Sequence, residues 1–407
     1  MKYLFCSSVH NMADYPHLCE RSKISLSLAD HNLNFNIVIG LGQVLGKPIK
    51  LINNAPIPTY PKYPKIWFRK HRWSHTEGAD DIHCGFINLP IIKHLSRACT
   101  TFRALRREIK AADNEPVCVL TYDIHPSTAV AIKLAKMLYK KIITCAVLPD
   151  IPNAVLLASS GGKLNRSTKF KAAIKTFFIK QFDSYVFLTE HMKQAVDVTD
   201  KAYTVMEGIY NSAQPALEDK TTEQKIILYS GQLNPAYGME NLIEAFLRIN
   251  REHSDYRLWL CGGGKLVEHI KRLALQFPAI EYFGYVGPDK VRECQRQATV
   301  LINPRQNTDQ FTKFSFPSKT MEYLASGRLV VGYKLDGIPA EYDEHIIYVP
   351  DNSVQTLCDT LIEVCSWDAE KQRQKGQAAR SFILQNKNPE KQCQRIVQML
   401  QTLSKSL

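Results

Sequence analysis

The chain has 407 residues, of which 45% are hydrophobic and 22% are charged, so it is a folded protein longer than one hydrophobic core usually serves. Its apolar runs are shorter than the roughly 20 residues of a membrane-spanning helix, and its start has too few apolar residues for a signal peptide. The eleven cysteines lack the spacing of a zinc site. We therefore expect a cytoplasmic protein with reduced thiols and two domains.

The net charge of +13 is carried almost entirely by the first half of the chain. Residues 1–211 contain 28 Lys and Arg against 16 Asp and Glu, whereas residues 212–407 contain 24 against 23. A basic half indicates an anionic partner, such as a membrane surface or a phosphorylated acceptor. We do not expect a nucleic acid, because no helix-turn-helix, zinc-finger or RRM-type motif accompanies the charge.

Short β-branched and aromatic runs alternate with helical patterns along the chain, which indicates parallel α/β architecture. In the first half, the predicted strands are Tyr3–Cys6, Pro48–Ile52, Val117–Tyr122, Ile142–Leu148 and Tyr185–Thr189. In the second half, they are Ile226–Tyr229, Arg257–Cys261, Ile280–Phe283, Val300–Asn303 and Leu329–Gly332. The apolar spacing predicts helices over Asn241–Glu252, Asp368–Leu384 and Pro389–Leu403.

The polar segment Asn211–Lys225 separates the two series of strands and is the predicted domain boundary. We expect one Rossmann-like, doubly wound domain over residues 1–211 and a second over 212–385. Residues 386–407 form a predicted C-terminal helix that returns to the first domain. Two such domains facing each other across a cleft place the ligand at the carboxyl ends of both sets of strands.

The segment Leu301–Gly327 carries the most specific chemical signal in the chain. A strand ends at Asn303, and Pro317 and Gly327 bound a helix. The loop between the strand and the helix contains three charged residues, Arg305, Asp309 and Lys313. A polar loop that leads into a helix N-terminus is an expected binding site for an anion.

Ser318 and Lys319 lie in the first turn of this helix, where free backbone N–H groups and a cation can hold a diphosphate. Glu322, one turn further on, can accept hydrogen bonds from the two hydroxyls of a ribose. The alternative interpretation is that Lys319 and Glu322 form an exposed i,i+3 ion pair on a surface helix.

A second expected anion site is the turn from Gly231 to Gly238, which joins a strand to a helix. Glycine in such a turn lets backbone N–H groups approach a phosphate. Many turns of this kind need glycine only for a positive φ, so this signal is weak by itself.

Together these pieces resemble the donor-binding domain of the family 4 retaining glycosyltransferases, which have the GT-B fold. Members of similar pattern are bacterial enzymes that assemble capsule, exopolysaccharide or O-antigen. The resemblance covers about Ile226–Tyr342 and is fainter in the first domain. The matching segments are YSGQLNPAYGMENLIEAF, LWLCGGG, IEYFGYVG, ATVLINPR, FPSKTMEYLASGRLVV and GIPAEY.

The resemblance implies that Glu322 binds the nucleotide ribose and that the first domain binds the acceptor. It also implies roles for the residues at the two turns and beside the base. The implied diphosphate contacts come from Gly231, Gln232, Gly238, Ser318 and Lys319, and the implied base contacts come from Phe283 and Tyr285.

Three positions depart from the family pattern. Many members have Arg at Gln232, Lys at Tyr237 and a second Glu at Phe314. The charge of a leaving diphosphate therefore needs other cations, for which the candidates are Arg305, Lys313 and Lys319. Because no Asp-x-Asp pair occurs, we expect a site that uses no metal and no cofactor besides the donor.

In the first domain, Asp150 follows the strand Ile142–Leu148, where similar enzymes place a polar residue that faces the reacting sugar. Asp150 can orient the acceptor hydroxyl or take its proton. The alternative is a structural Asp in a proline-bounded turn. Asp123 and His125 are weaker candidates, and the His125 side chain can instead cap the following helix.

Two basic and aromatic segments indicate contact with an anionic membrane. One is Pro61–Trp73, and the other is Lys163–Phe182, which has a helical pattern. A lipid-linked glycan acceptor at the inner face of the cytoplasmic membrane explains both segments. A surface loop and a solvated helix explain each one singly.

We expect a retaining glycosyltransferase that moves a sugar from a nucleoside-diphosphate sugar to a lipid-linked oligosaccharide in surface polysaccharide synthesis. One alternative is a GT-B sugar-nucleotide epimerase, for which a basic first half of the chain would have no use. The other is a non-catalytic protein that binds sugar nucleotides or anionic lipid.

Overall fold

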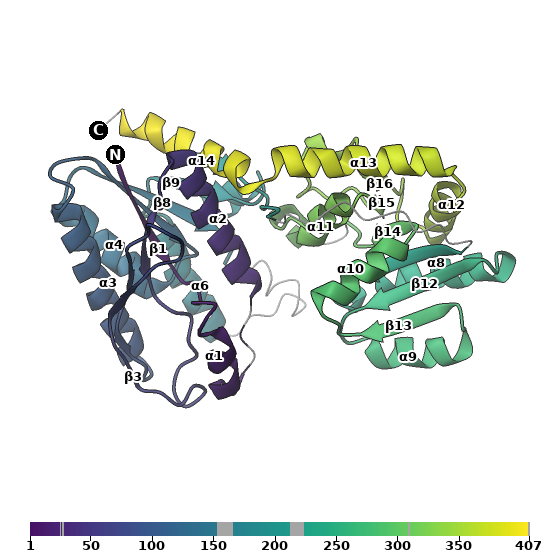
Figure 1. Cartoon of the computed structure of the whole chain (residues 1–407), viewed down its shortest axis with the longest axis horizontal. Helices are drawn as coiled ribbons and strands as arrows, with labels where there is room; N and C mark the ends of the chain where they lie inside the picture. Colours follow the sequence, from purple (N-terminus) through teal and green to yellow (C-terminus); the bar gives the residue numbers. More distant parts are fainter. Residues whose placement is uncertain (25, 27, 153–165, 212–223, 308–309, 406–407) are drawn as a thin grey trace. The chain divides into compact units, whose positions relative to one another are not determined.

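A computed structural model describes residues 1–24, 26, 28–152, 166–211, 224–307 and 310–405. The chain forms two compact units (Figure 1). The first unit contains Met1–Asn211 and Asn388–Leu407, and the second contains Ser212–Lys387. Most of the predicted boundary segment Asn211–Lys225 lies outside the described residues. No helix in the described ranges is long and apolar enough to cross a bilayer.

The first unit is built on an eight-stranded sheet with the order β10-β9-β8-β7-β1-β2-β5-β4. Every neighbouring pair is parallel except β4 and β5. The strands are β1 Lys2–Ser7, β2 Lys50–Asn53, β4 His71–Trp73, β5 Asp81–His83, β7 Val117–Tyr122, β8 Ile142–Leu148, β9 Ser184–Phe187 and β10 Ala202–Val205. Five of them were predicted from the sequence, whereas β4, β5 and β10 were missed because they are short.

A separate antiparallel pair lies in the first unit, formed by β3 (Trp67–Phe68) and β6 (Phe86–Ile87). The helices of the unit alternate with the strands, as expected for parallel architecture. They are α1 Tyr15–Arg21, α2 Ala29–Leu45, α3 Ile92–Lys110, α4 Pro126–Leu138, α6 Arg166–Ile179, α7 Met192–Ala195 and α14 Pro389–Ser404.

The C-terminal helix α14 belongs to the first unit, where it packs against α2. A Cβ on Gly40 of α2 would lie 2.3 Å from the carbonyl oxygen of Pro389, so the absence of a side chain lets the two helices approach closely. Ile396 and Leu400 of α14 join a core that also contains Phe5. The returning segment begins at Asn388, two residues after the predicted start at residue 386.

The second unit has a parallel six-stranded sheet with the order β13-β12-β11-β14-β15-β16. In chain order this is the 3-2-1-4-5-6 arrangement of a doubly wound dinucleotide-binding fold, with its topological switch between β11 and β14. The strands are β11 Lys225–Ser230, β12 Tyr256–Cys261, β13 Ile280–Gly284, β14 Val300–Asn303, β15 Leu329–Gly332 and β16 Ile347–Tyr348. Five were predicted, and β16 was missed because it has only two residues.

Helices connect these strands and carry apolar residues on the faces that they bury. In α8, for example, Leu242, Phe246 and Ile249 are buried. The helices and 3-10 turns are η1 Pro235–Tyr237, α8 Met239–Glu252, α9 Val267–Gln276, α10 Pro288–Gln297, η2 Gln310–Phe314, α11 Ser318–Ser326, η3 Ala340–Tyr342, α12 Val354–Cys365 and α13 Ala369–Asn386.

Candidate active site

The predicted turn after β11 lies against the end of β14, at the switch point of the second sheet. Gly238 ends this turn with a φ of +73°, and a Cβ there would lie 1.9 Å from the carbonyl oxygen of Pro304. No residue with a side chain fits this position without moving the backbone. The glycine that the sequence singled out therefore sets how closely the two loops approach.

The turn after β12 packs against the turn after β11 at the carboxyl ends of these two strands. A Cβ on Gly262 would lie 1.8 Å from the carbonyl oxygen of Gly231, and one on Gly264 would lie 2.4 Å from that of Leu233. The Leu233 N–H donates to the Gly263 carbonyl at 2.9 Å. The turns after β11 and β12 therefore pack backbone against backbone, which only glycine permits at these positions.

Helix α11 is held against β11 by Tyr323, which the sequence analysis did not single out. The fully buried Tyr323 hydroxyl accepts a hydrogen bond from the Ser230 N–H at 2.8 Å and donates one to the Ser230 carbonyl at 3.1 Å. Burial raises the pKa of Tyr323, so the hydroxyl keeps its proton. In addition, Asn303 donates to the Thr320 hydroxyl at 3.1 Å. These bonds place the start of α11 beside the ends of β11 and β14.

Pro317 is the N-cap of α11, and no side chain caps the helix start. Ser318 is exposed in the first turn. The Lys319 ammonium lies 2.7 Å from a carboxylate oxygen of Glu322, and both side chains are about half exposed. The i,i+3 ion pair that the sequence offered as an alternative therefore forms. Such a pair stabilises a helix by only about 0.2–0.5 kcal/mol, so a ligand can replace it at little cost.

The three cations proposed for the diphosphate have different surroundings. Arg305 is buried, donates to the Ser315 hydroxyl at 3.3 Å and lies 5.8 Å from the centre of the Tyr237 ring. Lys313 is half exposed, with its ammonium 3.8 Å from Asp336. Of the three, Arg305 lies next to the turn that ends at Gly238, because it follows Pro304 directly.

The other predicted residues of the second unit lie at or after the carboxyl ends of β11 and β13. Gln232 accepts a hydrogen bond from the Asn234 amide at 3.2 Å. Phe283, near the end of β13, packs edge-on against Trp259 with 5.2 Å between ring centroids. Tyr285 is 92% exposed two residues later, which leaves its ring accessible. Most of the predicted binding residues thus come from loops and helix starts that follow the strands, whereas Phe283 lies in β13, Glu322 lies within α11 and Asp309 lies outside the described residues.

Asp150 lies in the first unit, exposed in the turn after β8. Asp123 follows the neighbouring strand β7 with a φ of +55° and lies 2.6 Å from the Lys175 ammonium of α6. Burial by itself would raise the pKa of Asp123, but Lys175 and His125 outweigh this effect and lower it. His125 occupies the N-cap position of α4, but its side chain makes no cap hydrogen bond, so the capping alternative for this residue is wrong.

The sequence could have identified Tyr323 from the helical period. In α11, Thr320, Tyr323 and Leu324 are spaced to share one face, and all three are buried. A tyrosine on the buried face of a helix needs a partner for its hydroxyl. The three glycines after β12 carried no assigned role, because close approach of two loops depends on tertiary packing.

Comparisons with known proteins find a family match in the second unit. Residues 224–366 match the family model described as glycosyl transferases group 1. An exopolysaccharide phosphotransferase of Streptomyces coelicolor is 25% identical over 185 residues, which are 44% of this chain. The match spans only 19% of the length of that curated relative.

Solved structures resemble the whole chain. Sucrose-phosphate synthase from Thermosynechococcus elongatus has a TM-score of 0.63 at 13% identity, with 100% of both chains covered. The lipopolysaccharide outer core galactosyltransferase WaaB has a TM-score of 0.63 at 11% identity over 99% of both chains. The catalytic domain of starch synthase IV from Arabidopsis thaliana, bound to ADP and acarbose, has a TM-score of 0.60 at 11% identity over 100% of both. At these identities the likeness shows the fold, which is GT-B.

Proposed function

We propose, from the match of the second unit to group 1 glycosyl transferases, that this chain is a glycosyltransferase that uses a nucleoside-diphosphate sugar as its donor. The observation that carries the proposal is the close approach of Gly238 to Pro304, together with the hydrogen bonds between Tyr323 and Ser230. They bring a backbone-lined turn and an uncapped helix start to the switch point of a doubly wound sheet. That is the position at which such sheets bind nucleotides.

The donor is held by groups with distinct tasks. The backbone after Gly231 and the first turn of α11, at Ser318 and Lys319, bind the diphosphate. Glu322 accepts hydrogen bonds from the ribose once Lys319 turns from it to the phosphates. Phe283 and Tyr285 lie beside the base.

Charge on the leaving diphosphate is neutralised by side chains of the loop and of α11. Arg305 is the principal cation, because its guanidinium is buried and therefore acts in a low-dielectric environment. Lys313 and Lys319 contribute from half-exposed positions. With these cations the reaction needs no divalent metal, and it proceeds with retention at the anomeric carbon.

The acceptor is a lipid-linked oligosaccharide of bacterial surface polysaccharide synthesis, held by the basic first unit at the inner face of the cytoplasmic membrane. The excess of 12 positive charges over residues 1–211 supports a lipid-phosphate-bearing acceptor. The names of two similar proteins, an exopolysaccharide phosphotransferase and a lipopolysaccharide galactosyltransferase, support the polysaccharide role. Asp150 orients the acceptor hydroxyl or takes its proton.

The donor site is tested by thermal shift with uridine, guanosine and adenosine diphosphates and their sugars, because a ligand that binds only the folded protein raises its melting temperature. We expect one base to stabilise the protein and Glu322→Ala to weaken that nucleotide roughly ten- to a hundredfold. The matched control is Glu268→Ala in α9, which also removes an exposed i,i+3 partner of a lysine. Equal losses in both variants would contradict the ribose role.

Turnover separates the enzyme from a non-catalytic binding protein. The purified protein is incubated with a lipid-linked acceptor and a full panel of nucleotide sugars, with and without EDTA. We expect sugar transfer with one donor and no more than about a twofold change on chelation. Binding without transfer from any donor would favour the binding protein, and conversion of the donor without an acceptor would favour the epimerase.

A further inference from the structure

Helix α4 has an apolar face that stays exposed among the described residues of the first unit. Ile132 and Ala135 point into the core and are buried. By contrast, Leu134, Met137 and Leu138 are 43%, 73% and 63% exposed. Residues three and four apart are neighbours on a helix surface, so these three side chains form one patch instead of scattered apolar residues.

Helix α6 extends this surface, because α4 contacts α6. Phe177 of α6 is 55% exposed, and the Lys133 ammonium of α4 lies 5.1 Å from the centre of its ring. Phe170, seven residues earlier and 68% exposed, lies on the same side of α6 two turns away. We name the surface formed by Leu134, Met137, Leu138, Phe170 and Phe177 the α4–α6 face.

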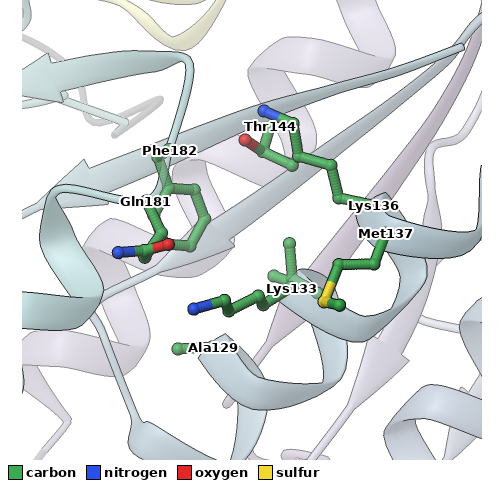
Figure 2. Close-up of a pocket in the computed structure, with 8 residues that line it drawn as sticks. Ala129, Lys133, Lys136, Met137, Thr144, Gln181 and Phe182 are labelled. Carbon is green, nitrogen blue, oxygen red and sulfur yellow. The ribbon is translucent and has the colours of Figure 1, made fainter. Parts of the chain in front are cut away.

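A hollow of about 300 Å³ adjoins the α4–α6 face. Figure 2 shows Lys133, Lys136 and Met137 of α4 beside Gln181 and Phe182, which follow α6. The lining includes the buried Phe182 ring and the side chains of Lys133 and Lys136, of which Lys136 pairs with Asp183. Apolar side chains beside the Lys133 ammonium suit a ligand that has an apolar part and a negative charge.

The charge of this surface has a single sign. Residues 126–141 and 166–181 contain nine Lys and Arg and no Asp or Glu. Three of these lysines bind acidic residues of other segments, in the pairs Lys136–Asp183, Lys175–Asp123 and Lys180–Asp197. The surface therefore keeps a large positive excess around its exposed apolar side chains.

We propose that the α4–α6 face docks on an anionic membrane, with the apolar side chains inserted at the headgroup level and the lysines beside the lipid phosphates. This proposal rests on the proposed function, because it names the surface by which the enzyme reaches a lipid-linked acceptor. Exposed Phe, Leu and Met among lysines are the combination that interfacial helices use. Nucleic acid satisfies the charge but gives no reason for Leu134, Met137 and Leu138 to be exposed.

The docking helix is also tied to the end of the sheet. Lys175 of α6 pairs with Asp123, which follows the carboxyl end of β7. A membrane bound through α6 therefore lies near the carboxyl end of β7, where Asp123 follows the strand.

The segment Pro61–Trp73, which the sequence favoured equally, is less suited to insertion. Trp67 is 60% exposed. Phe68, however, stacks on Phe86 at 4.5 Å, and Trp73 packs against His83 at 4.7 Å. Tyr63 is buried as well, so three of the four aromatic side chains in this segment pack within the first unit.

The test is co-sedimentation of the full chain with vesicles of phosphatidylglycerol and phosphatidylcholine, and with vesicles of phosphatidylcholine alone. We expect binding only to the anionic vesicles. The double variant Met137→Ser/Leu138→Ser should weaken this binding roughly tenfold, because two inserted apolar side chains are lost. The double variant Lys133→Gln/Lys140→Gln should weaken it roughly fivefold for each lysine removed.

Matched controls separate this face from the general charge of the protein. Leu275→Ser removes an apolar side chain of the second unit that is 86% exposed, and Lys47→Gln removes an exposed lysine of the first unit outside the face. Both controls should bind as the unchanged protein does. Melting temperatures of all variants check that they fold, as substitutions at exposed positions should allow.

Three results would overturn the proposal. One is no binding of the unchanged protein to anionic vesicles, and another is an equal loss in the controls. The third is a loss with the lysine variant but none with the apolar variant, which would indicate a polyanion such as nucleic acid. Vesicle binding does not depend on turnover, and nucleotide thermal shifts do not depend on vesicles, so failure of one proposal is distinguishable from failure of the other.

Discussion

The hydroxyl of Tyr323 lies 2.8 Å from the backbone nitrogen of Ser230, in a fully buried position between α11 and the end of β11. The same hydroxyl donates to the Ser230 carbonyl, so one side chain satisfies both polar groups of one residue. Ser230 directly precedes Gly231, where the proposed diphosphate turn begins. The side chain that anchors the helix therefore also fixes the start of the turn.

Replacement of Tyr323 by Phe should leave the buried Ser230 N–H and carbonyl without their partner. A buried polar group left unsatisfied costs about 1–3 kcal/mol, so we expect a loss of unfolding free energy in that range. Urea unfolding followed by fluorescence measures it. Tyr60→Phe, at a tyrosine 41% exposed, is the control and should change stability by less than about 0.5 kcal/mol. An unchanged midpoint in Tyr323→Phe would contradict the anchoring role.

Gly238 and Gly284 form a matched pair that tests whether glycine is needed for the close packing of the loop at Gly238 on Pro304. Both have a positive φ, +73° and +80°, but only a Cβ on Gly238 meets another atom, the Pro304 carbonyl oxygen at 1.9 Å. Gly284→Ala should cost about 1–2 kcal/mol of stability from backbone strain. Gly238→Ala should cost about 1–3 kcal/mol more, because the contact forces the two loops apart. Equal midpoints of thermal unfolding for the two variants would argue against this packing.

Arg305→Met should reduce the rate of sugar transfer more than it reduces nucleotide affinity. The buried guanidinium is proposed to stabilise charge that develops on the leaving diphosphate, and removal of one such group lowers kcat by about 10²–10³. Comparison of kcat with the affinity for the nucleotide diphosphate measures the difference. Arg248→Met, at an exposed arginine paired with Glu244, is the control and should leave kcat unchanged. An unaltered kcat in Arg305→Met would show that a different residue neutralises the charge on the leaving diphosphate.

His83 should make the protein less stable in mild acid. Burial lowers the pKa of His83 from 6.5 to about 4, helped by His71 and opposed by Asp14 and Asp81. Because the unfolded chain takes up this proton first, the contribution of neutral His83 is complete above about pH 6.5 and is lost as pH falls toward 4. The loss amounts to up to about 3 kcal/mol.

Urea unfolding at several pH values between about 7 and 4.5 measures this loss. His83→Gln should reduce the dependence on pH, and part of it should remain because burial also lowers the pKa of His10 to about 4. His17→Gln, at a side chain 80% exposed, should leave the dependence unchanged. A slope that His83→Gln does not alter would show that other groups carry the acid sensitivity.

The sequence by itself predicted the central strands well. Val117–Tyr122, Ile142–Leu148, Val300–Asn303 and Leu329–Gly332 have the predicted bounds in the structure. Parallel strands that are buried on both faces read as continuous apolar runs, which end where polar loop residues begin. The short strands β4 and β5 lack such runs, and β16 has only two residues, so their pairing with a neighbouring strand could not be predicted from the sequence.

The residues around the candidate site were partly predictable for a similar reason. Gly231, Gly238 and Ser318 follow or precede predictable elements, so their place at the carboxyl ends of strands follows from the order of strands and helices. Tyr323 was missed, because its partner is the main chain of a residue 93 positions away.

The sequence therefore determined the α/β class, the central strands of the two sheets and the turns that carry the candidate donor site. Only the tertiary structure decided that α14 packs on α2 and that α4 exposes Leu134, Met137 and Leu138. Local periodicity tells which residues share a helix face. It does not tell which of two apolar faces meets the core, because that depends on neighbours far away in the chain.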